Sequence, residues 1–264
     1  RDVPEHSATQ AQPELTYWFD DRPYRIDLAS PQNEGERLSL VVRVQDQAGL
    51  LNFNARNVEQ IRRYSRAMGI GEEQAATLAD ALADFIDDDD LRRLNGAEER
   101  DYRHAERPGP FNERLLSPAQ ALQAFGWERL RRRQRTALLG GAAADLETMP
   151  MNLNTAKPAV LQAWFDLTAE EAQLVVVARE QAPLIGARTI TALTGKPVVV
   201  EELRIYTFPS NRLRISVAPL QDQNLRMETW ITIGSLTADR PFFWSPVVVS
   251  DNFEGETGAI RGEE

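Results

Sequence analysis

The order of two hydrophobic patterns along the chain restricts its fold more than any other feature of the sequence. Apolar and polar residues alternate as in strands within the first 50 residues and again after Lys196-Pro197. Residues 54–193 instead carry apolar residues at the three- and four-residue spacing typical of helices. The few strands before residue 50 cannot form a stable sheet by themselves. We therefore predict an α+β fold in which both chain ends build one sheet and a large all-α domain is inserted between them.

This block order divides the chain into three segments. Residues 1–50 are the first part of the sheet domain, residues 51–197 the inserted α-helical domain, and residues 198–264 the second part of the sheet domain with a mobile acidic tail. Strands near residues 40 and 230 are expected to be neighbours, and Pro23 is expected in a turn. Helices are predicted over 56–67, 71–86, 117–125, 127–139, 156–164, 168–182 and 186–193. A capping box of Thr168 and Glu171 begins one of them.

The helical segment repeats a short motif at an offset of 100 residues. Residues 51–55 (LNFNA) correspond to residues 151–155 (MNLNT), and each copy precedes two predicted helices. The second asparagine of such an N-x-N element can cap free N–H groups at a helix N-terminus. We interpret the repeat as a duplicated helix-hairpin-helix-like unit. Its hairpins lack the glycine-rich, basic character of DNA-binding units, which favours a scaffold role.

The composition excludes several classes of protein. A chain of 264 residues with 42% hydrophobic and 27% charged residues is globular, and its net charge of −10 argues against nucleic acid as the general partner. The arginine-rich run at residues 128–135 is interpreted as an exposed helix face, with a binding patch as the alternative. The absence of cysteine excludes disulfides and thiolate metal sites. No apolar run approaches the length of a membrane span. Because the chain starts at Arg1, we expect a processed or truncated soluble part of a protein.

The stretch from Leu82 to Tyr102 holds the strongest concentration of charge. Its eight acids and three arginines give a net charge of −5, half of the chain's −10, within 21 residues. Four consecutive aspartates should end a helix after Ile86 in an open loop. Oxygen ligands concentrated in an open loop suit Ca²⁺, although Leu91 and Arg92 occupy positions that exclude an EF-hand. A solvated acidic loop is the alternative interpretation.

Three ordered motifs give the chain its resemblance to a known family. Residues 44–55 (VQDQAGLLNFNA) are similar to a D-x-x-G-x-(I/L)-N-x-N segment. Residues 82–98 (LADFIDDDDLRRLNGAE) are similar to a D-(W/F)-I-D-x-D-(D/E)…N-G-A-E stretch, and residues 151–161 (MNLNTAKPAVL) to an L-N-(V/I)-N-T-A repeat. Together they resemble the periplasmic part of minor pseudopilin K of bacterial type II secretion systems. Phe85 stands where the family usually has tryptophan, Gln47 where an acid or glycine is commoner, and Tyr102 where it often has two tyrosines.

This resemblance implies an antiparallel, pilin-like sheet interrupted by the α-helical domain, with calcium held in loops of the insertion. It implies a non-enzymatic subunit at the tip of the pseudopilus. That subunit would assemble with minor pseudopilins I and J to initiate the pseudopilus and support protein export across the outer membrane. The full-length protein would be periplasmic and anchored in the inner membrane of a Gram-negative bacterium by an N-terminal hydrophobic helix, which is absent from this sequence.

Within the acidic stretch, the expected calcium ligands are Asp87, Asp89, Asp90, Glu98 and Asp101. The three aspartates follow the predicted helix end, and the Asn95-Gly96 turn signal can return the two later acids toward them. Without a cation these carboxylates would repel one another, whereas with Ca²⁺ they become ligands. Oxygen ligands and the absence of nearby cysteine favour calcium over zinc. We expect its role to be structural.

Two further functions are weighed against the tip subunit. An enzyme is disfavoured because the only histidines are His6 and His104 and no nucleophile-elbow or phosphate-loop motif is present. Four crowded aspartates also lack the contrasting environments that separate a general acid from a base. A calcium-dependent extracytoplasmic binding or adhesion module is the alternative function, and it would need exposed aromatics beside an open coordination site. The aromatic residues Trp18, Phe19 and 242–244 are either sheet core or a contact surface for partner pseudopilins.

Overall fold

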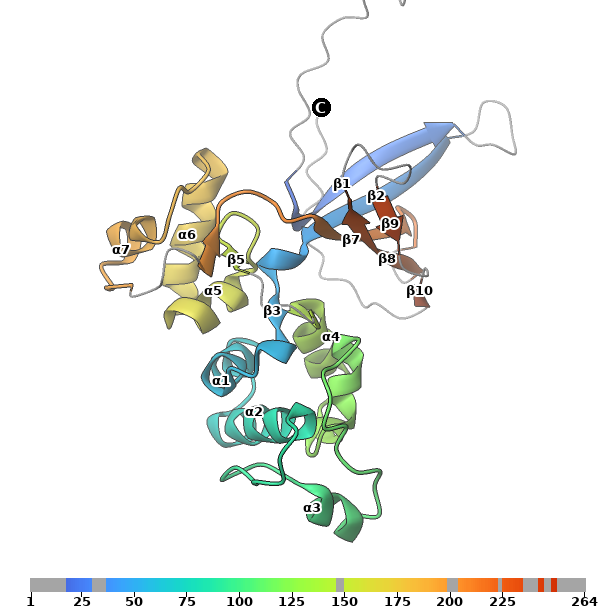
Figure 1. Cartoon of the computed structure of the whole chain (residues 1–264). Helices are drawn as coiled ribbons and strands as arrows, with labels where there is room; N and C mark the ends of the chain where they lie inside the picture. Colours follow the sequence, from blue (N-terminus) through green and yellow to red (C-terminus); the bar gives the residue numbers. More distant parts are fainter. Residues whose placement is uncertain are drawn as a thin grey trace, which may run out of the picture.

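One antiparallel sheet joins the two ends of the chain (Figure 1). The computed structural model describes residues 18–29, 37–145, 150–198, 204–222, 225–234, 242–244 and 248–250. The strand order is β1-β2-β7-β8-β10, with β9 also paired to β8. The strands are β1 (Asp20–Ala29), β2 (Arg37–Asp46), β7 (Arg212–Pro219), β8 (Arg226–Ile233), β9 (Phe242–Trp244) and β10 (Val248–Ser250). The predicted α+β fold, with one sheet built from both chain ends, is confirmed.

The two chain ends meet between β2 and β7. Their register runs from Leu40 opposite Pro219 to Asp46 opposite Leu213. The expected pairing of strands near residues 40 and 230 is wrong, because β7 lies between β2 and β8. Strands β7 and β8 follow each other directly in the chain and pair with each other, as consecutive strands usually do.

The first strand is longer than the sequence pattern predicts. Pro23 does not form a turn but lies inside β1, opposite Arg43. Proline is tolerated there because β1 is an edge strand of the described sheet and has a partner on one side only. The register shifts between Asp20 and Pro23, and Asp21 has a φ of 70°. This irregularity is a β-bulge, which bends the strand near its start.

Between β2 and β7 the chain is mainly helical. The α-helices are α1 (Val58–Ala67), α2 (Glu72–Ile86), α3 (Glu99–His104), α4 (Arg132–Gly140), α5 (Pro158–Phe165), α6 (Ala169–Gln181) and α7 (Arg188–Thr194). The predicted capping box forms at α6, where Thr168 N donates to Glu171 Oε2 at 2.7 Å and Glu171 N donates to Thr168 Oγ1 at 3.2 Å. None of the described helices is long and apolar enough to cross a membrane.

The observed helices differ from the predicted ones at three places. The segment expected to be helical over 117–125 forms a 3₁₀ helix, Pro118–Gln123. The helix expected over 127–139 begins only at Arg132, after a separate 3₁₀ turn at Trp127–Arg129. Gly126, with a φ of 84°, interrupts the segment between the two 3₁₀ turns. Helix α3 was not predicted, because six residues carry too little periodicity to reveal it.

Two short parallel pairs connect the helices to each other. Strand β3 (Leu51–Asn52) pairs with β4 (Ala142–Ala143), and β5 (Met151–Asn152) pairs with β6 (Ile205–Tyr206). Helices α1–α4 form a lobe below the sheet in Figure 1, and α5–α7 form a second lobe beside it. The expected second sheet segment therefore does not start with β6, which pairs outside the main sheet.

The lobe of α1–α4 holds the largest buried side chains. Phe53 packs edge-on against Trp127 and Tyr64, with ring centroids 5.5 and 6.5 Å apart. Trp127 Nε1 donates to the carbonyl oxygen of Leu78 in α2 at 2.9 Å. All four side chains are buried. Burying a large apolar side chain contributes about 1.5–3 kcal/mol, so this aromatic group fixes the 3₁₀ turn at Trp127 against α1 and α2.

The two N-x-N elements make equivalent contacts. Asn54 donates to Leu115 O at 2.8 Å and accepts from Leu115 N at 2.8 Å. Asn154 does the same with Leu184, at 3.0 and 2.8 Å. The expectation that the second asparagine caps the following helix is wrong, because Asn54 lies inside the 3₁₀ turn Phe53–Ala55 and the N-cap of α1 is Asn57. Each asparagine side chain instead forms hydrogen bonds with the backbone of a leucine that is distant in the sequence.

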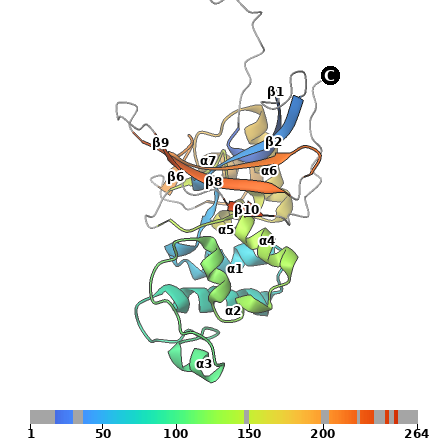
Figure 2. The same cartoon turned by 90° about the vertical axis from the view of Figure 1, so that its right-hand side faces the viewer.

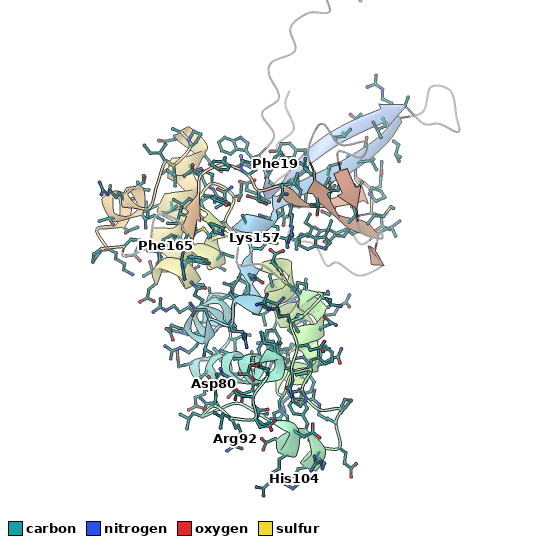
Figure 3. The ribbon with its side chains drawn as sticks, viewed as in Figure 1. Phe19, Asp80, Arg92, His104, Lys157 and Phe165 are labelled. Atoms are coloured by element: carbon teal, nitrogen blue, oxygen red, sulfur yellow. The ribbon has the colours of Figure 1, made fainter. Side chains whose placement is uncertain are left out.

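A fully buried carboxylate joins the sheet to the helical lobes. Asp46, at the end of β2, accepts five hydrogen bonds of 2.6–3.1 Å, from Ala48 N, Asn152 Nδ2, Thr155 Oγ1, Ser210 N and Ser210 Oγ. We call these residues the Asp46 cluster. Beside it, Lys157 (labelled in Figure 3) pairs with Asp21 at 2.6 Å. The junction is therefore held by polar contacts whose donors come from segments more than 100 residues apart.

Candidate functional site

The acidic loop, residues 87–98, lies at the end of the molecule farthest from the sheet. It connects α2 to α3, which is at the bottom of the molecule in Figures 1 and 2. Figure 3 shows Asp80, Arg92 and His104 at the same end. Helix α2 ends at Ile86 because Asp87 is extended, with a φ of −84° and a ψ of 173°. The predicted end of this helix is confirmed.

The Asn95-Gly96 turn returns the loop toward α2. Asn95 donates from its backbone N and its Nδ2 to Asp80 Oδ2, at 3.0 and 2.9 Å. Gly96 lies directly against the side chain of Asp84, such that a Cβ atom at this position would be 1.8 Å from Asp84 Oδ2. Only glycine leaves room for this approach, which explains the residue that follows Asn95.

Arg93 bridges two buried aspartates. Its Nη1 lies 2.5 Å from Asp84 Oδ1 and 2.6 Å from Asp87 Oδ2, and its backbone N donates to Asp84 Oδ2 at 3.2 Å. Asp84 is fully buried and Asp87 is 3% exposed. Burial raises the pKa of Asp84, although Arg93 opposes the shift. The guanidinium therefore acts as a counter-ion within the loop.

Glu98 is a buried carboxylate without a partner among the described residues. It is 6% exposed, and neither Oε1 nor Oε2 has a hydrogen-bond partner in that part of the chain; the same is true of Asp87 Oδ1. Burial, followed by the charges of Asp84, Asp87, Asp90 and Asp89, raises the pKa of Glu98 to about 7. Buried polar atoms are almost always hydrogen-bonded, so three unpaired carboxylate oxygens in one loop indicate a missing partner.

The five predicted calcium ligands occupy different environments. Asp87 and Glu98 are buried, whereas Asp89 and Asp90 are exposed. Asp89 Oδ1 accepts from Leu91 N at 2.8 Å. Asp101 accepts from Glu98 N at 3.1 Å and from Arg92 Nη1 at 3.2 Å. Within the described ranges, no three histidine or acidic side chains already form a group that could hold a metal ion.

The loop nevertheless has the chemistry of a cation site. Of the three buried acids, Asp84 and Asp87 pair with Arg93 and Glu98 does not, so the group carries a net charge of −2 when all three are ionised. The unpaired atoms are all carboxylate oxygens, the hard donors that Ca²⁺ prefers. The residues present therefore fit a divalent cation by charge and donor type, although the carboxylates would have to move closer together to bind it.

Two residues of this site were missed in the sequence. Neither Asp84 nor Arg93 is among the calcium ligands predicted from the sequence. Asp84 and Asp87 are three residues apart across the end of α2, so their side chains share one side of the helix. That spacing could have indicated that Asp84 belongs to the site. The contact of Arg93 with the two aspartates depends on the turn at Gly96, so residue spacing could not predict it.

The aromatic residues near the loop differ in exposure, since Phe111, whose ring centroid lies 4.6 Å from that of Phe85, is partly exposed. Phe85 stacks with Tyr102 at a centroid distance of 6.2 Å, and both are buried. His104 is exposed at the C-terminal turn of α3. Of the predicted interface aromatics, Trp18 and Phe19 are half-buried, and Arg22 lies 5.2 Å from the Trp18 ring. The side chains of residues 242–244 lie outside the description.

A second candidate surface is one face of the main sheet. Cross-strand pairing aligns Val42 with Tyr24 and Val217. We call this side the apolar sheet face, which is half-buried or exposed and comprises Tyr24, Ile26, Leu28, Leu38, Leu40, Val42, Val44, Ile215, Val217 and Met227.

On β2 and β7 the opposite face of the sheet is largely buried although most of it is polar, whereas Arg25 and Asp27 of β1 on that face are exposed. Arg214 Nη2 donates to Gly140 O at 2.8 Å, and Gln45 Nε2 donates to Thr155 O at 3.1 Å. Ser39 and Ser216 on this face are also buried. The usual arrangement covers the apolar face and solvates the polar one. Here the helical lobes cover the polar face, and the apolar sheet face remains partly open.

The comparisons with known proteins agree on one family. A family model described as type II secretion system (T2SS) protein K matches residues 37–131. Type II secretion system protein K of Pseudomonas aeruginosa is 30% identical over 167 residues, which are 60% of this chain and 47% of that protein. This chain thus spans about half the length of that relative.

A solved structure shares the fold. A chain of the GspK-GspI-GspJ complex from the type 2 secretion system of enterotoxigenic Escherichia coli is 17% identical and superposes with a TM-score of 0.57. The match covers 86% of this chain and 83% of that chain. The residue range of the family model includes both the end of β2 and the acidic loop, two of the three motifs that carried the resemblance. Residues 37–131 thus match the model of the type II secretion system protein K family, and most of the chain is similar in fold to a chain of that complex.

Proposed function

We propose that this chain is the periplasmic part of a non-enzymatic minor pseudopilin at the tip of a type II secretion pseudopilus. It assembles there with minor pseudopilins I and J, initiates the pseudopilus and supports protein export across the outer membrane. The full-length protein is anchored in the inner membrane by an N-terminal helix. The match of residues 37–131 to the protein K family model and the similarity in fold to a chain of the Escherichia coli GspK-GspI-GspJ complex support this role.

The observation that carries the proposal is the apolar sheet face. An apolar surface on a sheet whose polar face is already covered is suited to a protein contact. Partner pseudopilins would cover it, which makes the sheet the assembling part of the molecule. Helices α1–α4 form a bulky lobe below the sheet (Figure 2). They would block a further subunit at that end, and this obstruction supports a terminal position in the filament.

The test is reconstitution with the I and J subunits of the same secretion system. Native mass spectrometry of the mixture should show a complex with one copy of each subunit. Val42→Asp introduces a charge in the middle of the apolar sheet face and should abolish that complex. Leu174→Asp, at an exposed position of α6, is the matched control and should leave it intact. Long homopolymers of this chain alone, or an intact complex of the Val42 variant, would contradict the proposal.

We also propose that the chain is organised as a sheet domain, residues 1–50 and 198–264, with residues 51–197 as an inserted helical domain. The polar junction around Asp46 supports it, because both lobes connect to the sheet there. Limited proteolysis should cut near residues 50–56 or 194–198 and leave a helical fragment. A stable fragment of residues 1–150 would argue against this division.

The acidic loop is proposed to hold a structural calcium ion. Asp87, Asp89, Asp90, Glu98 and Asp101 are the ligands expected from the sequence, and the unpaired oxygens of Asp87 and Glu98 support the first and fourth of them. Bound calcium supplies the positive charge that the loop lacks and a flexible coordination shell for oxygens. Its effect would be to fix the connection between α2 and α3, without a chemical step.

A further inference from the structure

Arg93 occupies the position at which the acidic loop most needs positive charge. Its Nη1 contacts both Asp84 Oδ1 and Asp87 Oδ2, so two buried carboxylates share one guanidinium charge. The side chain is 35% exposed, while the carboxylates of Asp84 and Asp87 are 0% and 4% exposed. The arginine therefore reaches in from solvent, and its outer part remains free to move outward.

Only one of the two carboxylate oxygens of Asp87 is paired among the described residues. Its Oδ2 is bonded to Arg93, whereas its Oδ1 is buried without a partner among the described residues. Glu98, with two unpaired oxygens, is close enough to both Asp84 and Asp87 for their charges to perturb it. A divalent cation bound by Asp87 and Glu98 would therefore compete with the guanidinium for Asp87.

We infer that Arg93 is a resident counter-ion of the acidic loop and that binding of a divalent cation is an exchange in which its guanidinium leaves Asp87. This inference rests on the proposed calcium site and adds its regulation. Without the metal, Arg93 holds the loop closed on Asp84 and Asp87. With the metal, two like charges would crowd the same carboxylates, so the side chain swings into solvent.

The backbone of the loop allows this exchange without unfolding. The N–H of Arg93 donates to Asp84 Oδ2 at 3.2 Å, and this bond does not depend on the guanidinium. Asn95 remains bonded to Asp80 through two further hydrogen bonds. The turn therefore stays attached to α2 while the side chain moves. Arg93 consequently lowers the affinity for the cation and stabilises the metal-free loop.

Calcium titration of charge-matched variants tests the exchange. Calcium chloride is titrated calorimetrically into the wild-type chain, Arg93→Gln and Arg100→Gln. Arg100 is an exposed arginine of the same acidic stretch, so its variant has the same net charge and controls for long-range electrostatics. Arg93→Gln should bind calcium about tenfold more tightly than Arg100→Gln, because charge-assisted hydrogen bonds no longer compete. In chelator, Arg93→Gln should melt at a lower temperature than Arg100→Gln.

The outcomes separate this inference from the calcium proposal. If wild type and both variants bind calcium with equal affinity, the calcium site stands and the exchange is wrong. If none of them binds calcium at millimolar concentration, both proposals fail. Arg93→Lys provides the same test should the glutamine variant not fold, since an ammonium group keeps the charge but lacks the planar fork of arginine. It should bind calcium more tightly than wild type, and equal or weaker binding would overturn the exchange.

Discussion

Two buried carboxylates of this chain differ in the number of hydrogen bonds that they accept. Asp46, at the junction of the sheet and the helical lobes, accepts five hydrogen bonds. Glu98, in the acidic loop, accepts none from the described residues and is surrounded by other acids. A buried charge is stable only if donors or a counter-ion compensate its lost hydration. Donors within the fold compensate the charge of Asp46, whereas no described residue donates to Glu98, and we propose that a bound cation compensates its charge.

The difference follows from the neighbours that each acid has in the sequence. Asp46 begins the segment that leads to the first N-x-N element, and the second element supplies Asn152 and Thr155 as its donors. Glu98 instead lies among the acids of its own stretch, whose charges act on it, and Arg93 supplies one positive charge against three buried acids. We therefore expect the stability of the Asp46 cluster to be independent of bound ions. We expect the stability of the acidic loop to depend on them.

The largest effect is expected from Asp46→Ala. The substitution leaves the donors of Asn152, Thr155 and Ser210 without an acceptor inside the junction. We expect a loss of about 3–5 kcal/mol in the free energy of unfolding, measured by urea denaturation at neutral pH. Asp88→Ala is the control, because the Asp88 side chain is 93% exposed. A loss of less than about 1 kcal/mol for Asp46→Ala would show that water replaces the buried acceptor easily.

Calcium removal should give the next largest effect. Binding to the folded form alone stabilises it by about 2.7 kcal/mol at a hundredfold excess of ligand over Kd. The melting temperature should fall in chelator and recover in calcium better than in magnesium. Asp46→Asn should respond to calcium as wild type does, because the junction lies far from the loop (Figure 1).

Two ligand variants complete that measurement. Asp89→Ala and Glu98→Ala should each abolish the recovery, because each removes oxygens that the cation needs. Identical melting curves of wild type in calcium and in chelator would identify the stretch as a solvated acidic loop.

A smaller effect is expected from Gly96→Ala. The added methyl group would lie 1.8 Å from Asp84 Oδ2, so either the turn or the Asp84 side chain must move. We expect destabilisation of about 2 kcal/mol, the range of overpacking in a tight site, together with weaker calcium binding. Gly186→Ala is the matched control, since a Cβ there would meet no atom within 4 Å. Equal unfolding free energies of the two variants would contradict the close approach of Gly96 to α2.

The fold was predictable because its signals are periodic and local. Strand alternation before Asp46 and after Arg212, with helical spacing between them, was sufficient to infer one sheet built from both ends. The position of β7 between β2 and β8 was not, because alternation does not encode which strands pair. The contacts of Asn54 and Asn154 were also missed. Their partners, Leu115 and Leu184, are 61 and 30 residues away, and nothing in a leucine indicates that its backbone will be bonded.

The acidic loop was predictable in composition but not in arrangement. Four aspartates after Ile86 correctly ended α2, and the Asn-Gly pair correctly marked the return of the chain. The sequence gives equal weight to each acid, so it could not separate the buried Asp84 and Asp87 from the exposed Asp89 and Asp90. Burial depends on how α2 and the turn pack together. The unpaired state of Glu98 is likewise a property of that packing.

The smallest effect gives the sharpest contrast between the acidic loop and the Asp46 cluster. Replacing the acid by its amide should stabilise the fold in the loop and destabilise it in the cluster. Glu98→Gln removes one negative charge from a group of acids while keeping the shape of the side chain. In chelator we expect a gain of about 1 kcal/mol in unfolding free energy, since the loss of repulsion outweighs an amide that is still buried without a partner. Asp46→Asn should destabilise instead, because its amide nitrogen would replace one acceptor oxygen and face either the donors of Asn152 and Thr155 or those of Ala48 and Ser210. Urea denaturation of both variants in chelator measures the two signs side by side. Destabilisation by Glu98→Gln would mean that the loop already satisfies this carboxylate without a metal ion.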